Sequence, residues 1–97
     1  MSDISEKFDL TDKTALITGA AGLLGLQHAA ALLDSGATVV LTDINEASLA
    51  STSMSLLSKA DSERISTRVM NVCRPEDIST VSEELASEGQ RVDILVN

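Results

Sequence analysis

The sequence predicts an α/β protein built on a partial, doubly wound parallel sheet, and three observations lead to this prediction. Short apolar segments alternate along the chain with longer segments of helical periodicity, as in strands connected by helices. Residues 38–42 are apolar or β-branched without polar alternation, which is typical of a strand buried on both faces. A glycine-rich segment, residues 18–25, separates the first strand from the first helix. We expect four strands in the order 3-2-1-4, with right-handed crossovers through three helices.

The boundaries of the predicted elements follow from local signals. Gly36 ends the first helix at the usual C-terminal position for glycine, and Gly89 ends the third. Asn45 can cap the second helix, and Pro75 is favoured in the first turn of the third. Residues 1–12 are expected to be a polar tail and residues 13–97 one domain. The expected strands are residues 13–18, 38–42, 65–70 and 93–96, and the expected helices are residues 23–35, 46–59 and 75–88.

Helical spacing predicts which side chains face the sheet. For the second helix these are Ala47, Ala50, Met54 and Leu57, and for the third they are Ile78, Val81 and Leu85. Met70 is also expected in the core, whereas Arg64 and Arg68 are expected to be surface charges. His28 has no partners at metal-ligand spacing, so we predict no metal site and place it at the edge of the polar face of the first helix. Cys73 is expected to be a packed or merely exposed thiol, with a reactive thiol beside Arg74 as the alternative.

Composition limits the classes of partner. A chain of 97 residues with a formal net charge of −8 forms one acidic domain at most, which nucleic acids and anionic membranes would repel. No apolar run approaches the about 18 residues of a membrane span, and the N-terminus has no apolar signal region. A single cysteine cannot form an internal disulfide, which fits a reducing compartment. We therefore expect a cytoplasmic protein without nucleic-acid or membrane partners.

The glycine-rich segment predicts a phosphate site. Glycines there allow positive φ and keep side chains away from a docked ligand. The following helix directs its free N–H groups and the positive end of its dipole at the turn. A dinucleotide pyrophosphate is the ligand that we expect.

Asp43 closes the second predicted strand, eighteen residues after Gly25. A carboxylate at this position accepts hydrogen bonds from the adenosine ribose hydroxyls and repels a 2′-phosphate, which favours NAD over NADP. No Arg or Lys in the glycine turn or directly after Asp43 is placed to hold such a phosphate. The alternative is that Asp43 is a solvated turn residue before a helix.

Together these motifs resemble the N-terminal part of a short-chain dehydrogenase/reductase, whose cofactor domain has a Rossmann-type fold. The resemblance covers about residues 8–97. The matching stretches are Thr18–Gly25, Asp43, Asn71–Val72 and Asp93–Asn97.

The resemblance implies specific cofactor-binding roles. Asp43 would bind the ribose. Asn71 stands where the family usually has an Asp that touches adenine, and Val72 would pack beside the base. Asn97 matches the first Asn of the family's Asn-Asn-Ala-Gly turn and would line the central part of the cofactor. The residues expected to wrap the pyrophosphate and adenosine side are Gly19, Ala20, Ala21, Gly22 and Leu24.

The glycine spacing departs from the compact members of the family, which usually have Gly-x-x-x-Gly-x-Gly. Gly19, Gly22 and Gly25 instead follow the spacing of the extended members that act on nucleotide sugars. The stretch Asp93–Asn97 favours the compact dehydrogenases and extends over more residues, so we give it more weight.

The family's catalytic Ser and Tyr-x-x-x-Lys would follow the fourth strand, and the sequence contains no tyrosine. We therefore expect the NAD-binding half of a longer oxidoreductase that transfers hydride between nicotinamide and an alcohol or ketone, with no catalytic residue in this chain and no activity of its own. The full-length protein would bind the small-molecule substrate and could form a homo-oligomer. The alternatives are part of an extended-type nucleotide-sugar epimerase or dehydratase, and a non-catalytic dinucleotide-binding module.

Overall fold

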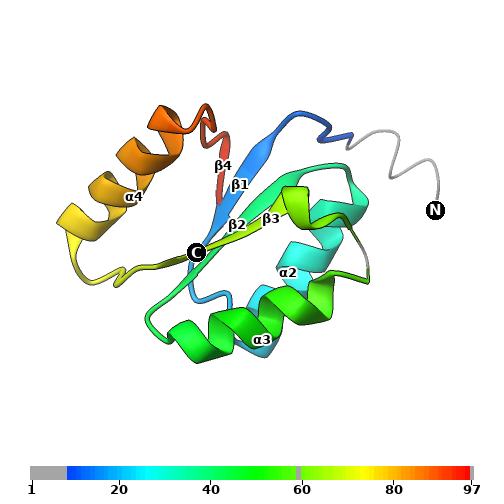
Figure 1. Ribbon diagram of the computed structural model, residues 1–97, viewed down its shortest axis with the longest axis horizontal. Helices are drawn as coiled ribbons and strands as arrows, with labels where there is room; N and C mark the ends of the chain where they lie inside the picture. The colour runs from blue at the N-terminus through cyan, green and yellow to red at the C-terminus, as the bar shows by residue number, and fades with distance from the viewer. Residues whose placement is uncertain (1–8, 59, 97) are drawn as a thin grey trace.

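The computed structural model describes residues 9–58 and 60–96, which form a four-stranded parallel sheet with helices on both faces (Figure 1). The strands lie in the order β3-β2-β1-β4, as predicted. The strands are β1 (Thr14–Ile17), β2 (Thr38–Asp43), β3 (Ile65–Val69) and β4 (Ile94–Val96). The helices are α2 (Leu23–Asp34), α3 (Glu46–Leu56) and α4 (Pro75–Ser87), with a short 3-10 turn η1 (Ser62–Arg64) before β3.

The two central strands are the most deeply buried part of the molecule. Residues 39–42 of β2 have no exposed surface, which confirms that this uninterrupted apolar segment is covered on both faces. Leu16 of β1 is in register with Val40 of β2 on one side and with Leu95 of β4 on the other. The buried Thr42 hydroxyl donates a hydrogen bond to the Ile17 carbonyl at 2.7 Å, so this polar group is satisfied inside the core.

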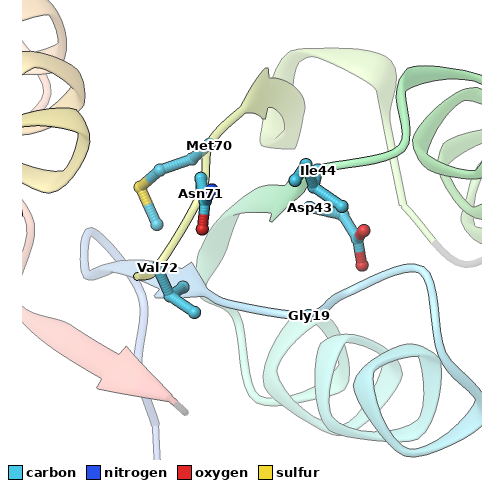
Figure 2. A pocket seen from close by; sticks show the side chains of 6 residues that line it. All are labelled: Gly19, Asp43, Ile44, Met70, Asn71 and Val72. Carbon is cyan, nitrogen blue, oxygen red and sulfur yellow. The ribbon is translucent and has the colours of Figure 1, made fainter. Parts of the chain in front are cut away.

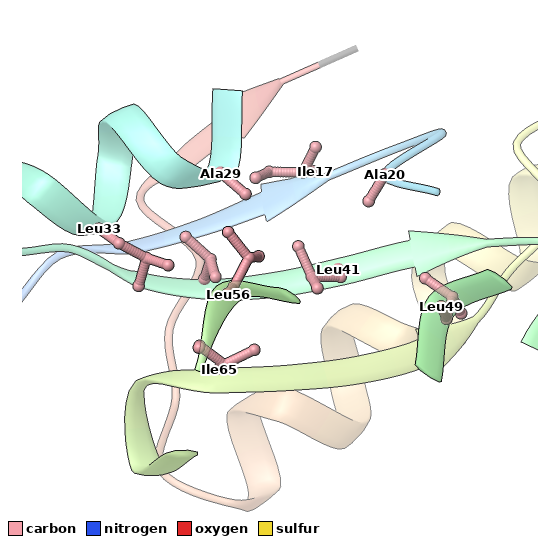
Figure 3. Packing of buried hydrophobic residues seen from close by; sticks show 9 residues of the cluster. Ile17, Ala20, Ala29, Leu33, Leu41, Leu49, Leu56 and Ile65 are labelled. Atoms are coloured by element: carbon pink, nitrogen blue, oxygen red, sulfur yellow. The ribbon is translucent and has the colours of Figure 1, made fainter. Parts of the chain in front are cut away.

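Successive residues of each strand point to opposite faces and form two separate cores. On one face, α2 and α3 pack against the sheet (Figure 3). On the other face, α4 packs against Leu16, Val40 and Met70. The first core consists of Ile17, Ala20, Ala29, Leu33, Val39, Leu41, Leu49, Leu56 and Ile65. The inner face predicted for α4 is confirmed, because Val81 and Leu85 are buried and Ile78 packs beside them.

The face predicted for α3 is wrong. Met54 is 73% exposed, and Ala47, Ala50 and Leu57 are exposed as well. The buried side chains are instead Leu49, Thr52 and Leu56. Both sets recur at helical spacing, so periodicity alone does not choose between them. The helix packs Leu49 and Leu56 against the sheet and leaves Met54 and Leu57 exposed.

Arg64 is not the surface charge that we predicted. Its Nη2 atom donates hydrogen bonds to the Leu33 carbonyl at 2.6 Å and to the Ala37 carbonyl at 2.9 Å. A cation at the C-terminal end of a helix adds hydrogen bonds to the carbonyl groups there and interacts favourably with the helix dipole. Arg68 is also engaged, because its Nη2 atom lies 2.6 Å from Glu88 Oε1. Arg64 thus connects the start of β3 to the end of α2.

Replacing Arg64 by alanine is expected to lower the free energy of unfolding by about 2 kcal/mol, since hydrogen bonds from a charged donor to two partly buried carbonyls are lost. Urea unfolding followed by far-UV circular dichroism measures the change. Arg91 is exposed and serves as the matched control, for which R91A should alter stability by less than about 0.5 kcal/mol. Equal stabilities of R64A and R91A would contradict the role assigned to Arg64.

Candidate nucleotide-binding site

The glycines of the turn between β1 and α2 have different physical roles. Gly19 has φ +63°, a left-handed conformation that other residues adopt only with strain. A Cβ atom on Gly25 would lie 2.6 Å from Ala20 Cα and 2.8 Å from the Gly19 carbonyl oxygen, so α2 packs directly on the backbone of the turn. A Cβ atom on Gly22 would meet only the Gly19 oxygen, at an ordinary 3.7 Å. The fold therefore requires glycine at the two outer positions, and Gly22 leaves open space at the start of α2.

Hydrogen bonds fix the turn to the ends of two neighbouring strands. The Ala20 N–H donates to the Thr42 carbonyl at 2.9 Å, and the Thr18 N–H donates to the Val96 carbonyl at the same distance. The Ala21 N–H donates to Asp43 Oδ2 at 3.2 Å. The N–H groups of Ala20 and Ala21 are therefore used within the protein, and the buried Ala20 side chain belongs to the core.

The backbone N–H groups that could donate to a ligand lie in the first turn of α2. Its N–H groups have no intrahelical acceptor, and the N-cap residue Gly22 forms no side-chain capping bond. No acidic residue occupies this turn, so no side chain of the turn itself repels an anion. Leu24 lies in the same turn, with a side chain that is 64% exposed. This uncapped helix terminus can bind a phosphate group through backbone N–H groups alone.

The Asp43 carboxylate links the glycine turn to the start of α3. One oxygen accepts the Ala21 N–H, and the other accepts the Asn45 N–H at 3.1 Å. Each carboxylate oxygen can accept a further hydrogen bond. Asp43 is half-buried and lines the adjacent cavity, toward which its oxygens retain acceptor capacity.

A cavity of about 150 Å³ opens where β2 and β3 end (Figure 2). Gly19, Asp43, Asn71 and Val72, all predicted from the sequence as cofactor-binding residues, line it together. Ile44 and Met70 also line it, and the sequence analysis did not assign them to the site. Each adjoins a residue that was assigned, because the segment leaving a parallel strand passes along the edge where ligands bind.

Apolar side chains flank the cavity. The exposed side chains of Ile44 and Val72 come from the segments after β2 and β3 and lie at its two sides, as Figure 2 shows. Met70 also lines the cavity, but its side chain is buried in the core under α4. A ring held between Ile44 and Val72 would lie beside the Asp43 carboxylate.

The backbone and side chain of Asn71 are held by the loop that begins α4. Its N–H donates to Asp77 Oδ2 at 3.1 Å, and its carbonyl accepts the Arg74 N–H at 3.0 Å. Its side-chain oxygen accepts the Cys73 N–H at 2.9 Å. These contacts fix the orientation of the amide at the edge of the cavity.

The predicted site also includes the end of β4, of which the structure describes Val96 but not Asn97. Asn97 lies outside the described residues, so its assignment to the cofactor site stays a prediction. Val96, the last residue of β4, accepts hydrogen bonds from both the N–H and the hydroxyl of Thr18, which brings the end of β4 to the glycine turn. Across residues 9–58 and 60–96, no group of three His, Cys, Asp or Glu side chains could hold a metal ion.

These features define a class of protein. A parallel sheet whose first strand leads through a glycine turn to an uncapped helix, with an acidic residue after the second strand, is a Rossmann-type nucleotide-binding domain. The site lies at the carboxyl edge of the sheet beside the change in strand order, where such domains bind their ligands.

Comparison with known proteins identifies the family. The family model described as short chain dehydrogenase matches residues 13–97, and the chain belongs to this family. It is 33% identical over 88 residues to the short chain dehydrogenase/reductase dpfgG of Gibberella zeae, covering 91% of this chain and 32% of that protein. It is 31% identical over 90 residues to the NAD-dependent glycerol dehydrogenase of Listeria innocua, covering 93% of this chain and 34% of that protein.

A solved structure agrees with this assignment. The L-sorbose reductase of Gluconobacter frateurii, complexed with NADPH and L-sorbose, superimposes with a TM-score of 0.81 at 31% identity, over 93% of this chain and 34% of the reductase. The chain thus spans about a third of the length of each of these three relatives. In the described part of the chain, no helix is long and apolar enough to cross a membrane.

Serine substitutions at two glycines of the turn are expected to separate the requirements of the fold from those of the ligand. G25S should lower the free energy of unfolding by about 2 kcal/mol or more, because the new Cβ overlaps backbone atoms of the turn. G22S should leave stability within about 0.5 kcal/mol of the wild type or raise it slightly, since serine is a favoured N-cap residue. Thermal and urea unfolding compare the two variants, and equal destabilisation would contradict the packing role of Gly25.

Proposed function

We propose that this chain binds the adenosine and pyrophosphate part of NAD for an oxidoreductase that transfers hydride between nicotinamide and an alcohol or ketone. The observation that carries the proposal is the convergence of Asp43, the uncapped start of α2 and the cavity between Ile44 and Val72 at one edge of the sheet. Family membership supplies the class of reaction.

Each part of the dinucleotide has a fitting partner in the chain. The N–H groups in the first turn of α2 would hold the pyrophosphate, and Gly22 leaves the room for it. Asp43 would accept hydrogen bonds from the ribose hydroxyls with its remaining lone pairs. Ile44 and Val72 would enclose the base. The bound nicotinamide would accept or donate the hydride, and this chain's residues orient and bind the other half of the molecule.

The preference for NAD rests on charge. A 2′-phosphate would lie against the Asp43 carboxylate, and no Arg or Lys lines the described cavity to offset the repulsion. The relatives differ in this respect, since the Listeria enzyme is named as NAD-dependent and the Gluconobacter structure contains NADPH. Asp43 is the residue on which our proposal of a preference for NAD rests.

The alternative hypothesis is a dinucleotide-binding module without catalysis. In the first hypothesis, a Ser and a Tyr-x-x-x-Lys from further sequence would complete the enzyme. The nucleotide-sugar alternative depended on the position of Gly22, which the packing of the turn does not require, so the spacing gives little reason to prefer it.

Titration with NADH and NADPH tests the cofactor proposal. The chain contains no tryptophan, so ligand fluorescence can be followed without a protein background. NADH should bind at least about tenfold more tightly than NADPH, and D43N should reduce this ratio severalfold because the repelling charge is lost. D61N removes an equal charge from an exposed residue outside the cavity and should leave the ratio unchanged. Tighter binding of NADPH by the wild type would overturn the preference.

Activity distinguishes the two functions. The 97-residue chain should bind NADH without oxidising it when ketones are supplied, because it has no tyrosine to provide the proton. A full-length protein that supplies the Ser and Tyr-x-x-x-Lys should oxidise NADH under the same conditions, measured as loss of absorbance at the reduced nicotinamide band. Turnover by the 97-residue chain would contradict the assignment of catalysis to other sequence.

A further inference from the structure

We infer that the outward side of α3 is a self-association surface, on which a second copy of this chain binds in antiparallel orientation about a two-fold axis. Four apolar side chains that share this side of the helix are exposed, and we call them the α3 stripe: Ala47, Ala50, Met54 and Leu57. Met54 is 73% exposed and Leu57 is 47% exposed. Other residues of α3 pack against the sheet, so the described part of the chain leaves this stripe to solvent.

The layer that carries the α3 stripe has very little charge. Among the exposed residues of α2 and α3, only Asp34 and Glu46 are charged, and each lies at an end of its helix. Across the sheet (Figure 1), α4 exposes three glutamates, Glu76, Glu83 and Glu84. A chain with a net charge of −8 repels a second copy of itself. The uncharged stripe is therefore a place where two copies can meet without setting carboxylates against each other.

The spacing of the α3 stripe suits packing against another helix. Its residues recur at i, i+3, i+7 and i+10, the spacing of the a and d positions along a coiled-coil seam. In an antiparallel pair about a two-fold axis, Ala47 lies opposite Leu57 of the second copy. Ala50 then lies opposite Met54 of the second copy, and each contact occurs twice.

This arrangement sets a small side chain against a large one in every layer, which fills the space between the helices. A parallel pair would instead set Met54 against Met54 and Ala50 against Ala50, crowding one layer and leaving a gap in the other. The order of small and large residues along the stripe therefore favours the antiparallel pair.

The length of α3 limits the strength of the dimer. The helix has 11 residues and is about 16 Å long. One helix face of this length offers less than the about 800 Å² per partner of a standard interface, so we expect a dissociation constant of the order of 10–100 μM. Salt screens the net negative charge, so the dimer should become tighter as the ionic strength rises.

Sedimentation equilibrium of the 97-residue chain between about 5 and 500 μM tests the inference, and the wild type should pass from monomer to dimer over this range. A50M crowds the layer that it shares with Met54, and M54A leaves a gap there. Each change alone should weaken the dimer about fivefold or more. The double variant A50M/M54A again sets a small side chain against a large one, and its dissociation constant should return to within about twofold of the wild type.

M54E and L95E form a matched pair, because each places a carboxylate at an exposed apolar residue. Leu95 is 55% exposed on β4, the edge strand of the sheet. M54E should abolish the dimer over the same range of concentrations, and L95E should leave its dissociation constant unchanged. Thermal unfolding confirms that both variants are folded.

Four results would each overturn the inference. They are a wild type that stays monomeric at about 500 μM, a dimer that survives M54E, a dimer that is lost in L95E, and a double variant that binds no more tightly than A50M or M54A. The proposed function is independent of all four results, because none of the substituted residues lines the cavity.

Discussion

The close contact between α2 and the backbone of the glycine turn is the constraint on which the rest of the site depends. With no side chain at Gly25, the helix begins directly on Ala20 and Gly19, and the N–H groups of its first turn face the carboxyl edge of the sheet. The turn is held from beneath by Thr42 and from the side by Asp43. The strand ends, the helix terminus and the cavity therefore form one connected unit, and a displacement of any of them changes the phosphate-binding donors.

The favourable electrostatic interactions that the site offers to an anion act over a short range. A chain with net charge −8 has little long-range attraction for a diphosphate, and no Arg or Lys lines the described cavity. Backbone N–H groups and the dipole of α2 supply the favourable interaction over a few ångströms. Asp43 adds a negative charge beside the place expected for the ribose. Under the proposed function, such an arrangement favours a ligand with hydroxyl donors over one with a further phosphate, and the residue that connects the turn to α3 is also the one expected to set selectivity.

Sequence patterns predicted the order of strands, the burial of β2 and the inner face of α4, because each depends on strong local signals. They failed where two solutions satisfied the same pattern. In α3, two sets of apolar residues recur at helical spacing, and the pattern alone does not say which set faces the sheet. Arg64 bonds to carbonyls at the end of a helix about thirty residues away, a partnership that no local pattern encodes.

The sequence by itself determined the class of site, since the glycine turn, Asp43 and the Asn71–Val72 pair mark the ends of three strands. It could not say how these residues act, because their roles depend on atoms brought together across the sheet. Only the tertiary structure showed that Gly25 is required by packing and Gly22 is not, and that the Ala20 and Ala21 N–H groups are already bonded. Only the tertiary structure brought Asn71 into one cavity with Gly19 and Asp43, because the ends of β1, β2 and β3 meet at the same edge of the sheet.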